Sequence, residues 1–142
     1  MSSRSIDDLD FSMTEPALEL IHQCRLKGID LLITCTYRSA AEQDILYAQG
    51  RTAPGHVVTR ARGCESLHNT TKDGKPAALA FDVVPLVNGK AYWQNTGKGT
   101  KLWQTIGEAG EKLGLEWGGR WPAPKTDMPH FEQKAPNAKT QL

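Results

Sequence analysis

Apolar residues at helical spacing predict the first regular element of the chain. Thr14 can cap a helix, and Pro16 then stands in its first turn, where a missing N–H costs little. One apolar stripe follows, at Ala17, Leu20, Ile21 and Cys24. We therefore predict a helix from Thr14 that ends at Gly28, with residues 1–13 as a mobile or loosely docked lead-in.

A short apolar run rich in β-branched residues comes next, at residues 29–37, and it predicts a buried strand. Ser39 and Glu42 then form a capping-box pattern that starts a second helix. Arg38 therefore sits at a strand-to-helix junction, where a side chain can be held rigidly over a cleft. The alternative is a surface arginine that forms an ion pair with Glu42 or Asp44.

The second helix is expected to end near Gly50, and the segment after it has little periodicity. Residues 50–65 are rich in Gly, Arg and Thr, so we predict a loop that could line a substrate groove. His56 lies in this loop and is expected at the surface. Cys64 stands four residues before His68, and such a pair could bind zinc, although carboxylates in better contexts compete for that role.

The stretch SLHNTTKDGKPAALAFDVVP carries His68 and Asp82 on either side of a strong turn signal. We expect His68 to end a short extended segment, and the sequence DGKP at residues 73–76 predicts a turn. A strand is expected over residues 77–86, where apolar neighbours surround Asp82. A buried charge without a partner is costly, and a metal ion would supply the partner.

Two alternatives stay open for this stretch. Asp82 could form a salt bridge with Arg38 or Arg62 instead of binding a metal ion. Asp73 is also close to His68 in sequence, but an aspartate in an Asp-Gly turn usually bonds to the backbone.

The C-terminal half predicts one more helix and a short strand. Thr100 can cap a helix that ends at Gly114, with an inward face formed by Trp103, Ile106, Gly110 and Leu113. Trp117 and Trp121 follow beside glycines. Either both tryptophans pack in the core or at its edge, or one of them forms the wall of a cleft. His130, Phe131 and Glu132 indicate a short strand, and residues 133–142 are expected to form a mobile tail.

Composition narrows the class of protein. The length of 142 residues is that of one domain, and 39% apolar and 23% charged residues are typical of a globular protein. A formal charge of +1 is too small to attract nucleic acid through the overall electrostatic field of the protein. The three cysteines, Cys24, Cys35 and Cys64, lack paired spacing, which argues against a disulfide framework and fits a reducing compartment. Cys24 and Cys35 lie in apolar segments and are expected in the core. We expect no signal peptide and no membrane insertion.

Two histidines and two carboxylates then stand out as candidate chemistry: His68, Asp82, Asp127 and His130. A catalytic zinc ion takes three protein ligands with nitrogen or oxygen donors and keeps a fourth position for water. A further carboxylate nearby can transfer the proton. The spacing is not that of an HExxH helix, and the two histidines lie far apart in the sequence.

Five segments in order strengthen this interpretation: TYRS, YAQGRTAPGHVVT, SLHN with AFDVVP, EWGGRW and DMPHFE. Between about residues 34 and 132 the chain resembles the M15 metallopeptidases. It is most similar to phage endolysins that act as L-alanyl-D-glutamate peptidases, which are related to D-alanyl-D-alanine carboxypeptidases. We expect a single α+β domain over residues 1–142, in which a small antiparallel sheet carries a zinc site and about three helices flank it.

The resemblance implies a role for each matching residue. One zinc ion per chain would be held by His68, Asp82 and His130. Asp127 would be the catalytic carboxylate, and Arg38 would stabilise the oxyanion that develops during the reaction. The same donor set also suits manganese or cobalt in vitro.

Substrate contacts are expected from Ser66, which matches the serine of the family's SxH motif, and from Trp121 at the cleft. The spacing from His68 to Asp82 is about twice that common in the family. The extra residues fall around the turn at residues 73–76, so we expect a lengthened hairpin that leaves both ligands in place.

The implied function is a zinc-dependent peptidoglycan endopeptidase that hydrolyses the L-alanyl-D-glutamate bond of the stem peptide for host cell lysis. The alternatives are a D-alanyl-D-alanine carboxypeptidase and a non-catalytic wall-binding module with structural zinc. We expect a monomer without a separate wall-binding domain. It would stay in the host cytoplasm until a holin-type partner releases it to the periplasmic cell wall.

Overall fold

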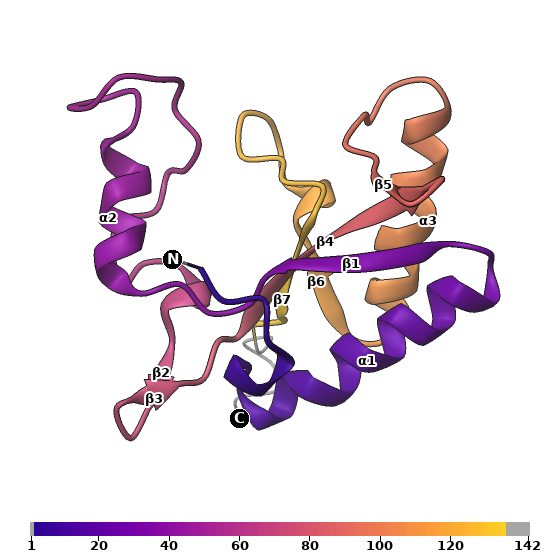
Figure 1. Ribbon diagram of the computed structural model, residues 1–142, viewed down its shortest axis with the longest axis horizontal. Coiled ribbons are helices and arrows are strands. Elements are labelled where there is room, and N and C mark those ends of the chain that lie inside the picture. Colours follow the sequence, from indigo (N-terminus) through magenta and orange to yellow (C-terminus); the bar gives the residue numbers. More distant parts are fainter. Residues whose placement is uncertain (1, 136–142) are drawn as a thin grey trace.

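The computed structural model describes residues 2–135, and this part of the chain forms an antiparallel sheet with the two longer helices packed on one face (Figure 1). The α+β fold predicted from the sequence, with a small antiparallel sheet and three helices, is confirmed. In chain order the elements are η1 Ile6–Asp8, α1 Phe11–Leu26, β1 Asp30–Cys35, α2 Ala40–Ala48, η2 Leu67–Asn69, β2 Thr71–Lys72, β3 Lys75–Pro76, β4 Ala80–Val87, β5 Lys90–Ala91, α3 Lys98–Lys112, β6 Leu115–Trp117, η3 Gly118–Arg120 and β7 His130–Gln133.

Strand β4 is the centre of the main sheet. The strand order is β1-β4-β7-β6, with β5 paired to the far end of β4, and each of these pairs is antiparallel. In this register Asp82 on β4 lies between Cys35 on β1 and His130 on β7. The pairing therefore brings three chemically active side chains to one end of the sheet, although they are far apart in sequence.

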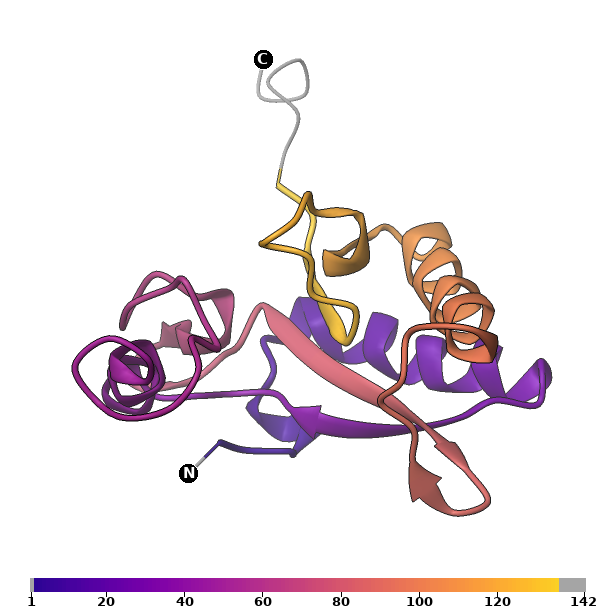
Figure 2. The same ribbon diagram turned by 90° about the horizontal axis from the view of Figure 1, so that it is seen from above.

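Alternation along the strands separates a core face from an open face. Phe81 stacks on Phe131 with ring centroids 5.7 Å apart, on the face that α1 and α3 cover (Figure 2). Gly110 of α3 allows this contact, because a Cβ there would stand 2.3 Å from the Phe131 ring. Successive side chains of a strand point to opposite faces, so Asp82 and His130 face away from the two helices.

The sequence predicts a mobile or loosely docked lead-in at residues 1–13. This prediction is wrong for residues 2–13, which the structure describes and which pack on the domain. Helix α1 begins at Phe11 rather than near Thr14, and the side chain of Asp10 caps it by accepting from the Ser12 N–H at 3.0 Å. Leu9 and Met13 are buried in the core. The apolar stripe of α1 thus extends further toward the N-terminus than the predicted cap allowed.

Other element boundaries also differ from the sequence prediction. Helix α3 begins at Lys98 after Gly97, which has a φ of 59°, whereas Thr100 lies inside the helix and its hydroxyl donates to the Asn95 carbonyl at 2.8 Å. Gln133 belongs to β7 and not to the predicted tail. Most of that predicted tail, residues 136–142, lies outside the described residues.

The turn predicted at residues 73–76 is confirmed as the tip of a small hairpin. Strands β2 and β3 form their own two-stranded sheet, apart from the main one (Figure 1). Asp73 and Gly74 have φ values of 54° and 75°, as a tight hairpin turn requires. The Ala77 N–H donates to the Thr70 carbonyl at 2.9 Å and closes the base of the hairpin. Within residues 2–135, no helix has the length and hydropathy to cross a bilayer.

Candidate metal and catalytic site

His68 is held by a short capped turn and not by the end of an extended segment, as the sequence had suggested. The Ser66 hydroxyl accepts from the His68 N–H at 3.1 Å, and the Asn69 side chain accepts from the Ser66 N–H at 3.2 Å. The His68 carbonyl accepts from the Arg38 N–H at 2.9 Å, which ties this turn to the end of β1. The His68 side chain is buried as a result.

The three predicted metal ligands meet around one oxygen atom. Asp82 Oδ1 lies 3.2 Å from His68 Nε2 and 3.1 Å from His130 Nδ1. The two imidazole rings meet edge to face, with centroids 5.1 Å apart. Two imidazole nitrogens and a carboxylate oxygen form a donor set that suits zinc.

The other nitrogen of each imidazole already has a hydrogen-bond acceptor. His68 Nδ1 lies 2.7 Å from the Thr36 carbonyl, and His130 Nε2 lies 2.8 Å from Glu132 Oε1. An acceptor at one nitrogen keeps the proton there and leaves the lone pair of the other nitrogen for a metal ion. The two remaining nitrogens, His68 Nε2 and His130 Nδ1, both face the Asp82 carboxylate. The residues present therefore fit a bound zinc ion.

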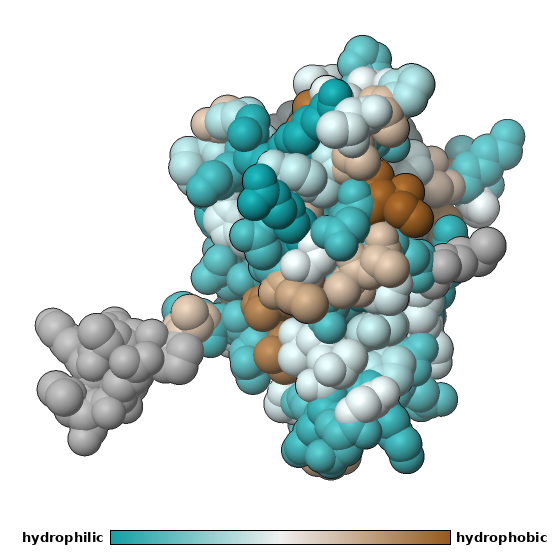
Figure 3. All heavy atoms as spheres, turned by 90° about the vertical axis from the view of Figure 1, so that its left-hand side faces the viewer, coloured by the Kyte–Doolittle hydropathy of each residue, from teal (hydrophilic) through white to brown (hydrophobic). Residues whose placement is uncertain are grey.

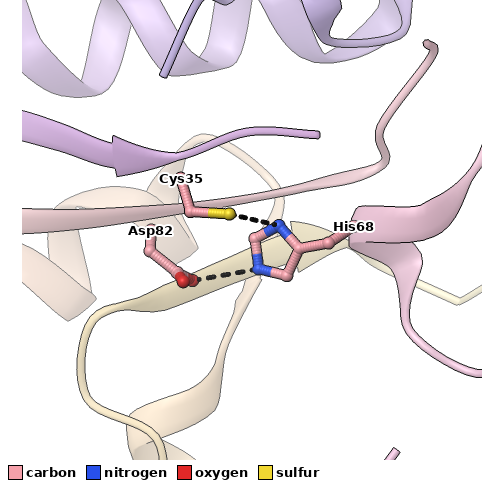
Figure 4. Close-up of side chains that lie close together, drawn as sticks. All are labelled: Cys35, His68 and Asp82. Atoms are coloured by element: carbon pink, nitrogen blue, oxygen red, sulfur yellow. Dashed lines mark hydrogen bonds and ion pairs between the residues drawn. The ribbon is translucent and has the colours of Figure 1, made fainter. Parts of the chain in front are cut away.

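Cys35 adds a thiol that the sequence analysis had treated only as a core residue. It is buried as expected, but its Sγ lies 3.6 Å from His68 Nδ1, and ligand atoms of Cys35, His68 and Asp82 all lie within 4.8 Å of one another. Figure 4 shows the His68 ring between the other two side chains, with one nitrogen toward the sulfur and one toward the carboxylate. Because the thiol faces the nitrogen that bonds to Thr36, the geometry favours His130 over Cys35 as the third ligand.

Charge coupling in this cluster is strong. Burial by itself lowers the pKa of His68, but hydrogen bonds to Asp82 and Cys35 and their charges outweigh burial and raise the pKa to about 10. For His130, burial is likewise outweighed by Asp82 and Glu132, which raise the pKa to about 9. Burial raises the pKa of Asp82, yet the two histidines hold it far below its ordinary value. Protons and a divalent cation would therefore compete for the same groups.

The cluster forms the floor of a cleft of about 870 Å³. One wall is α2 together with residues 57–61, and the other is Trp121 together with residues 124–127. The loop predicted at residues 50–65 thus does line a groove. Figure 3 shows that the face carrying α2 is mainly hydrophilic, with small hydrophobic patches. The cleft is lined by every residue predicted for the site: Arg38, Ser66, His68, Asp82, Trp121, Asp127 and His130.

Asp127 is open to the cleft and is fixed through its backbone. Its N–H donates to the Gly118 carbonyl at 2.9 Å, and its own carbonyl accepts from the His130 N–H at 3.2 Å. A Cβ at position 118 would stand 2.4 Å from the Asp127 carbonyl oxygen, so only glycine allows this approach. Desolvation in the cleft and the charge of Asp82 raise the pKa of Asp127 above its ordinary value, which makes the carboxylate a stronger base.

Arg38 is held at the junction of β1 and α2, as predicted. Its guanidinium donates to Gln43 Oε1 at 3.1 Å, to Ser2 Oγ at 3.1 Å and to Cys35 Sγ at 3.4 Å. Gln43 is fully buried and donates in turn to the Ala61 carbonyl at 2.8 Å. These contacts keep a fixed positive charge at the edge of the cleft.

The two tryptophans separate into the two roles left open by the sequence. Trp117 is buried in the core, and its indole N–H donates to the Met128 carbonyl at 2.8 Å. Trp121 lines the cleft with its ring centroid 5.1 Å from that of His130. Its indole N–H donates to Glu116 at 2.9 Å, which fixes the ring over the histidine.

The competing candidates lie apart from the three-ligand cluster. Asp73 is exposed at the tip of the hairpin, and His56 is exposed in the loop after α2. Cys64 is also exposed, and its backbone N–H donates to the Asn69 side chain at 3.2 Å. The charge partners of Asp82 are the two histidines, and not Arg38 or Arg62 as the alternative interpretation had it.

Glu132 and Gln43 are contacts that sequence reasoning missed. Glu132 could have been found, because it stands two residues after His130 on a predicted strand and must share its face. Gln43 follows the predicted helix cap, but its burial depends on the fold of the distant loop at residues 59–61. The position of Cys35 depends on an irregular register between Ile33 and Cys35, which no local pattern indicates.

Comparisons with known proteins find a matching family model and a similar relative. A peptidase M15 family model, described as D-alanyl-D-alanine carboxypeptidase, matches residues 60–133. The peptidoglycan L-alanyl-D-glutamate endopeptidase CwlK of Bacillus subtilis is 42% identical over 111 residues, which are 75% of this chain and 62% of CwlK. The chain thus spans about three fifths of the length of that relative.

Two solved structures share the fold. The LD-carboxypeptidase LdcB has a TM-score of 0.64 at 18% identity, over 88% of this chain and 58% of LdcB. The L-Ala D-Glu endopeptidase ChiX of Serratia marcescens has a TM-score of 0.53 at 18% identity, over 94% of this chain and 89% of ChiX. At these identities the likeness establishes a common architecture.

Proposed function

Because the chain belongs to the M15 peptidase family, we propose that it is a zinc-dependent peptidoglycan endopeptidase that hydrolyses the L-alanyl-D-glutamate bond of the stem peptide. The observation that carries the proposal is the meeting of His68, Asp82 and His130 around one point on the floor of a cleft. The relation to CwlK supports the choice of bond.

The roles of the residues follow from their positions. His68, Asp82 and His130 would hold one zinc ion, which supplies a Lewis acid that activates water and polarises a carbonyl group. Asp127 accepts a proton from the attacking water and passes a proton to the leaving amine. Arg38 stabilises the negative charge that develops on the carbonyl oxygen, a contribution of about 2.7–4 kcal/mol for donors of this kind.

A D-alanyl-D-alanine carboxypeptidase is the second candidate, and the description of the matching family favours it. Both reactions hydrolyse an amide and need the same ligands and the same proton acceptor. They differ in which amide of the stem peptide lies over the metal, and this depends on the walls of the cleft.

Digestion of purified peptidoglycan by the zinc-loaded protein separates the two candidates. Mass spectrometry and end-group analysis should find new N-terminal D-glutamate on the released fragments. Free D-alanine without new D-glutamate ends would instead identify a carboxypeptidase. Bound zinc without hydrolysis of either bond would favour a wall-binding module, and His68→Ala serves as the inactive control.

A role in host lysis is a separate proposal, and it rests on the resemblance to phage enzymes. The protein would accumulate as a monomer in the host cytoplasm and reach the periplasmic wall once a holin-type partner opens the membrane. We expect that production in bacterial cytoplasm causes lysis only after the inner membrane is permeabilised. Equal lysis by wild type and His68→Ala would contradict this role.

A further inference from the structure

Glu132 stands beside His130 on β7 and shares its face of the sheet. Its Oε1 lies 2.8 Å from His130 Nε2. The Glu132 side chain is 20% exposed and the His130 side chain is 7% exposed. Glu132 also lines the cleft that holds the metal cluster. Its carboxylate is thus in place to accept a hydrogen bond from the histidine on the side away from Asp82.

Backbone pairing on both sides fixes the position of Glu132. The residue pairs with Ala80 of β4 and with Glu116 of β6. The backbone of a strand with two neighbours has little freedom to shift, unlike that of a loop. The acceptor for His130 is therefore part of the rigid sheet.

A second contact, with the tilted ring of Trp121, restrains the same imidazole. Trp121 lies 5.1 Å from the His130 centroid, and Glu116 holds the Trp121 indole N–H at 2.9 Å. Two neighbouring carboxylates on the open face of the sheet thus orient two neighbouring rings. Glu132 acts on the nitrogen of His130, and Glu116 acts through the tryptophan.

From this geometry we propose that Glu132 is a positioning residue for the metal site. It holds the proton of His130 on Nε2 and turns the Nδ1 lone pair toward the point shared with His68 and Asp82. The inference rests on the proposed zinc site and adds a determinant of zinc affinity outside the ligand set. Outer partners of this kind typically change metal affinity by about 10–100-fold.

Zinc affinity of two variants tests this role, measured by competition with a chromophoric chelator. Glu132→Ala removes the acceptor and should weaken zinc binding by about 10–100-fold. Glu132→Gln keeps a carbonyl acceptor but no charge, so its affinity should fall between those of wild type and Glu132→Ala. In the zinc-loaded wild type, nitrogen-15 NMR should show a protected His130 Nε2–H signal that Glu132→Ala lacks.

Glu65→Ala is the matched control. Glu65 lines the same cleft, but its carboxylate accepts from the Arg62 backbone N–H at 2.6 Å. This variant should bind zinc within about twofold of wild type, because no ligand contact is lost. An equal loss in Glu65→Ala would assign the effect to the charge of the cleft and overturn the proposal.

Zinc binding by Glu132→Ala within about twofold of wild type would also overturn the proposal. A wild-type protein that binds zinc but leaves peptidoglycan intact would contradict the proposed function, and the affinity series would still measure the role of Glu132. The two proposals can therefore fail independently.

Discussion

At the scale of single residues, the proposed zinc site depends on which nitrogen of each histidine is free to bind the ion. The Thr36 carbonyl engages His68 Nδ1, and Glu132 engages His130 Nε2. The remaining nitrogens lie 3.2 Å and 3.1 Å from Asp82 Oδ1. His68 and Asp82 could be joined by either His130 or Cys35 as the third ligand. Substitution of each candidate distinguishes the two ligand sets.

His130→Ala should abolish stoichiometric zinc binding, whereas Cys35→Ala should retain one zinc ion per chain. The reason is that His130 Nδ1 faces the shared point and the Cys35 thiol faces the other nitrogen of His68. Zinc content after dialysis, measured by plasma mass spectrometry, checks the pair. Loss of zinc in Cys35→Ala with retention in His130→Ala would show that the thiol is the third ligand.

Zinc binding should release protons near neutral pH. His68 and His130 have pKa values raised to about 10 and about 9, so both are protonated at pH 7 unless a metal displaces the protons. Asp82, whose pKa is lowered, contributes no proton. Affinity should therefore rise from pH 6 to pH 8, by about tenfold per pH unit for each proton displaced.

Calorimetric titration with zinc in buffers of different ionisation enthalpy counts these protons. We expect release of about two protons per zinc ion at pH 7. Binding that is equally strong at pH 6 and pH 8, with no proton release, would be inconsistent with two imidazole ligands held in this way.

At the scale of elements, the pairing of β4 with β7 builds the site and the β2–β3 hairpin does not. Asp82 and His130 are opposite each other in that pairing, and His68 comes from the capped turn η2 before the hairpin. The hairpin forms a separate small sheet whose base is closed by Thr70 and Ala77. The long spacing between His68 and Asp82 is thus an insertion beside the site.

Replacement of residues 71–76 by a two-residue Asn-Gly turn should leave zinc binding unchanged. Thr70 and Ala77 are already hydrogen-bonded at 2.9 Å, and a tight turn can join such a pair. Chelator competition measures the zinc affinity of the shortened protein, which we expect within about threefold of wild type. A large loss of affinity in a protein with unchanged circular dichroism would show that the hairpin supports the ligands.

At the scale of the whole molecule, zinc should stabilise the fold because its ligands come from three separate segments. A ligand present at 100 times its dissociation constant adds about 2.7 kcal/mol to the free energy of unfolding. The melting temperature of the wild type should rise by several degrees with zinc and fall again with chelator. His130→Ala should show no such rise, and an equal rise in that variant would place the stabilising zinc elsewhere.

Local strand and helix patterns predicted the architecture, and motifs shared with the M15 family indicated the seven site residues that line the cleft. It did not predict the packing of residues 2–13, because the capping role of Asp10 and the burial of Leu9 depend on the rest of the fold. The place of Cys35 depends on a register irregularity that only strand pairing creates. Contacts between residues far apart in the chain produce no periodic pattern in the sequence.

The proposed site divides two roles: His68, Asp82 and His130 would hold zinc, and Asp127 would transfer the proton. The most direct test is the zinc content and peptidoglycan hydrolysis rate of Asp127→Ala, measured on one preparation. The variant should keep one zinc ion per chain, and its rate should fall by about 10²–10⁴-fold, as expected for loss of a general base. Hydrolysis at the wild-type rate, or loss of the zinc ion, would contradict this division of roles.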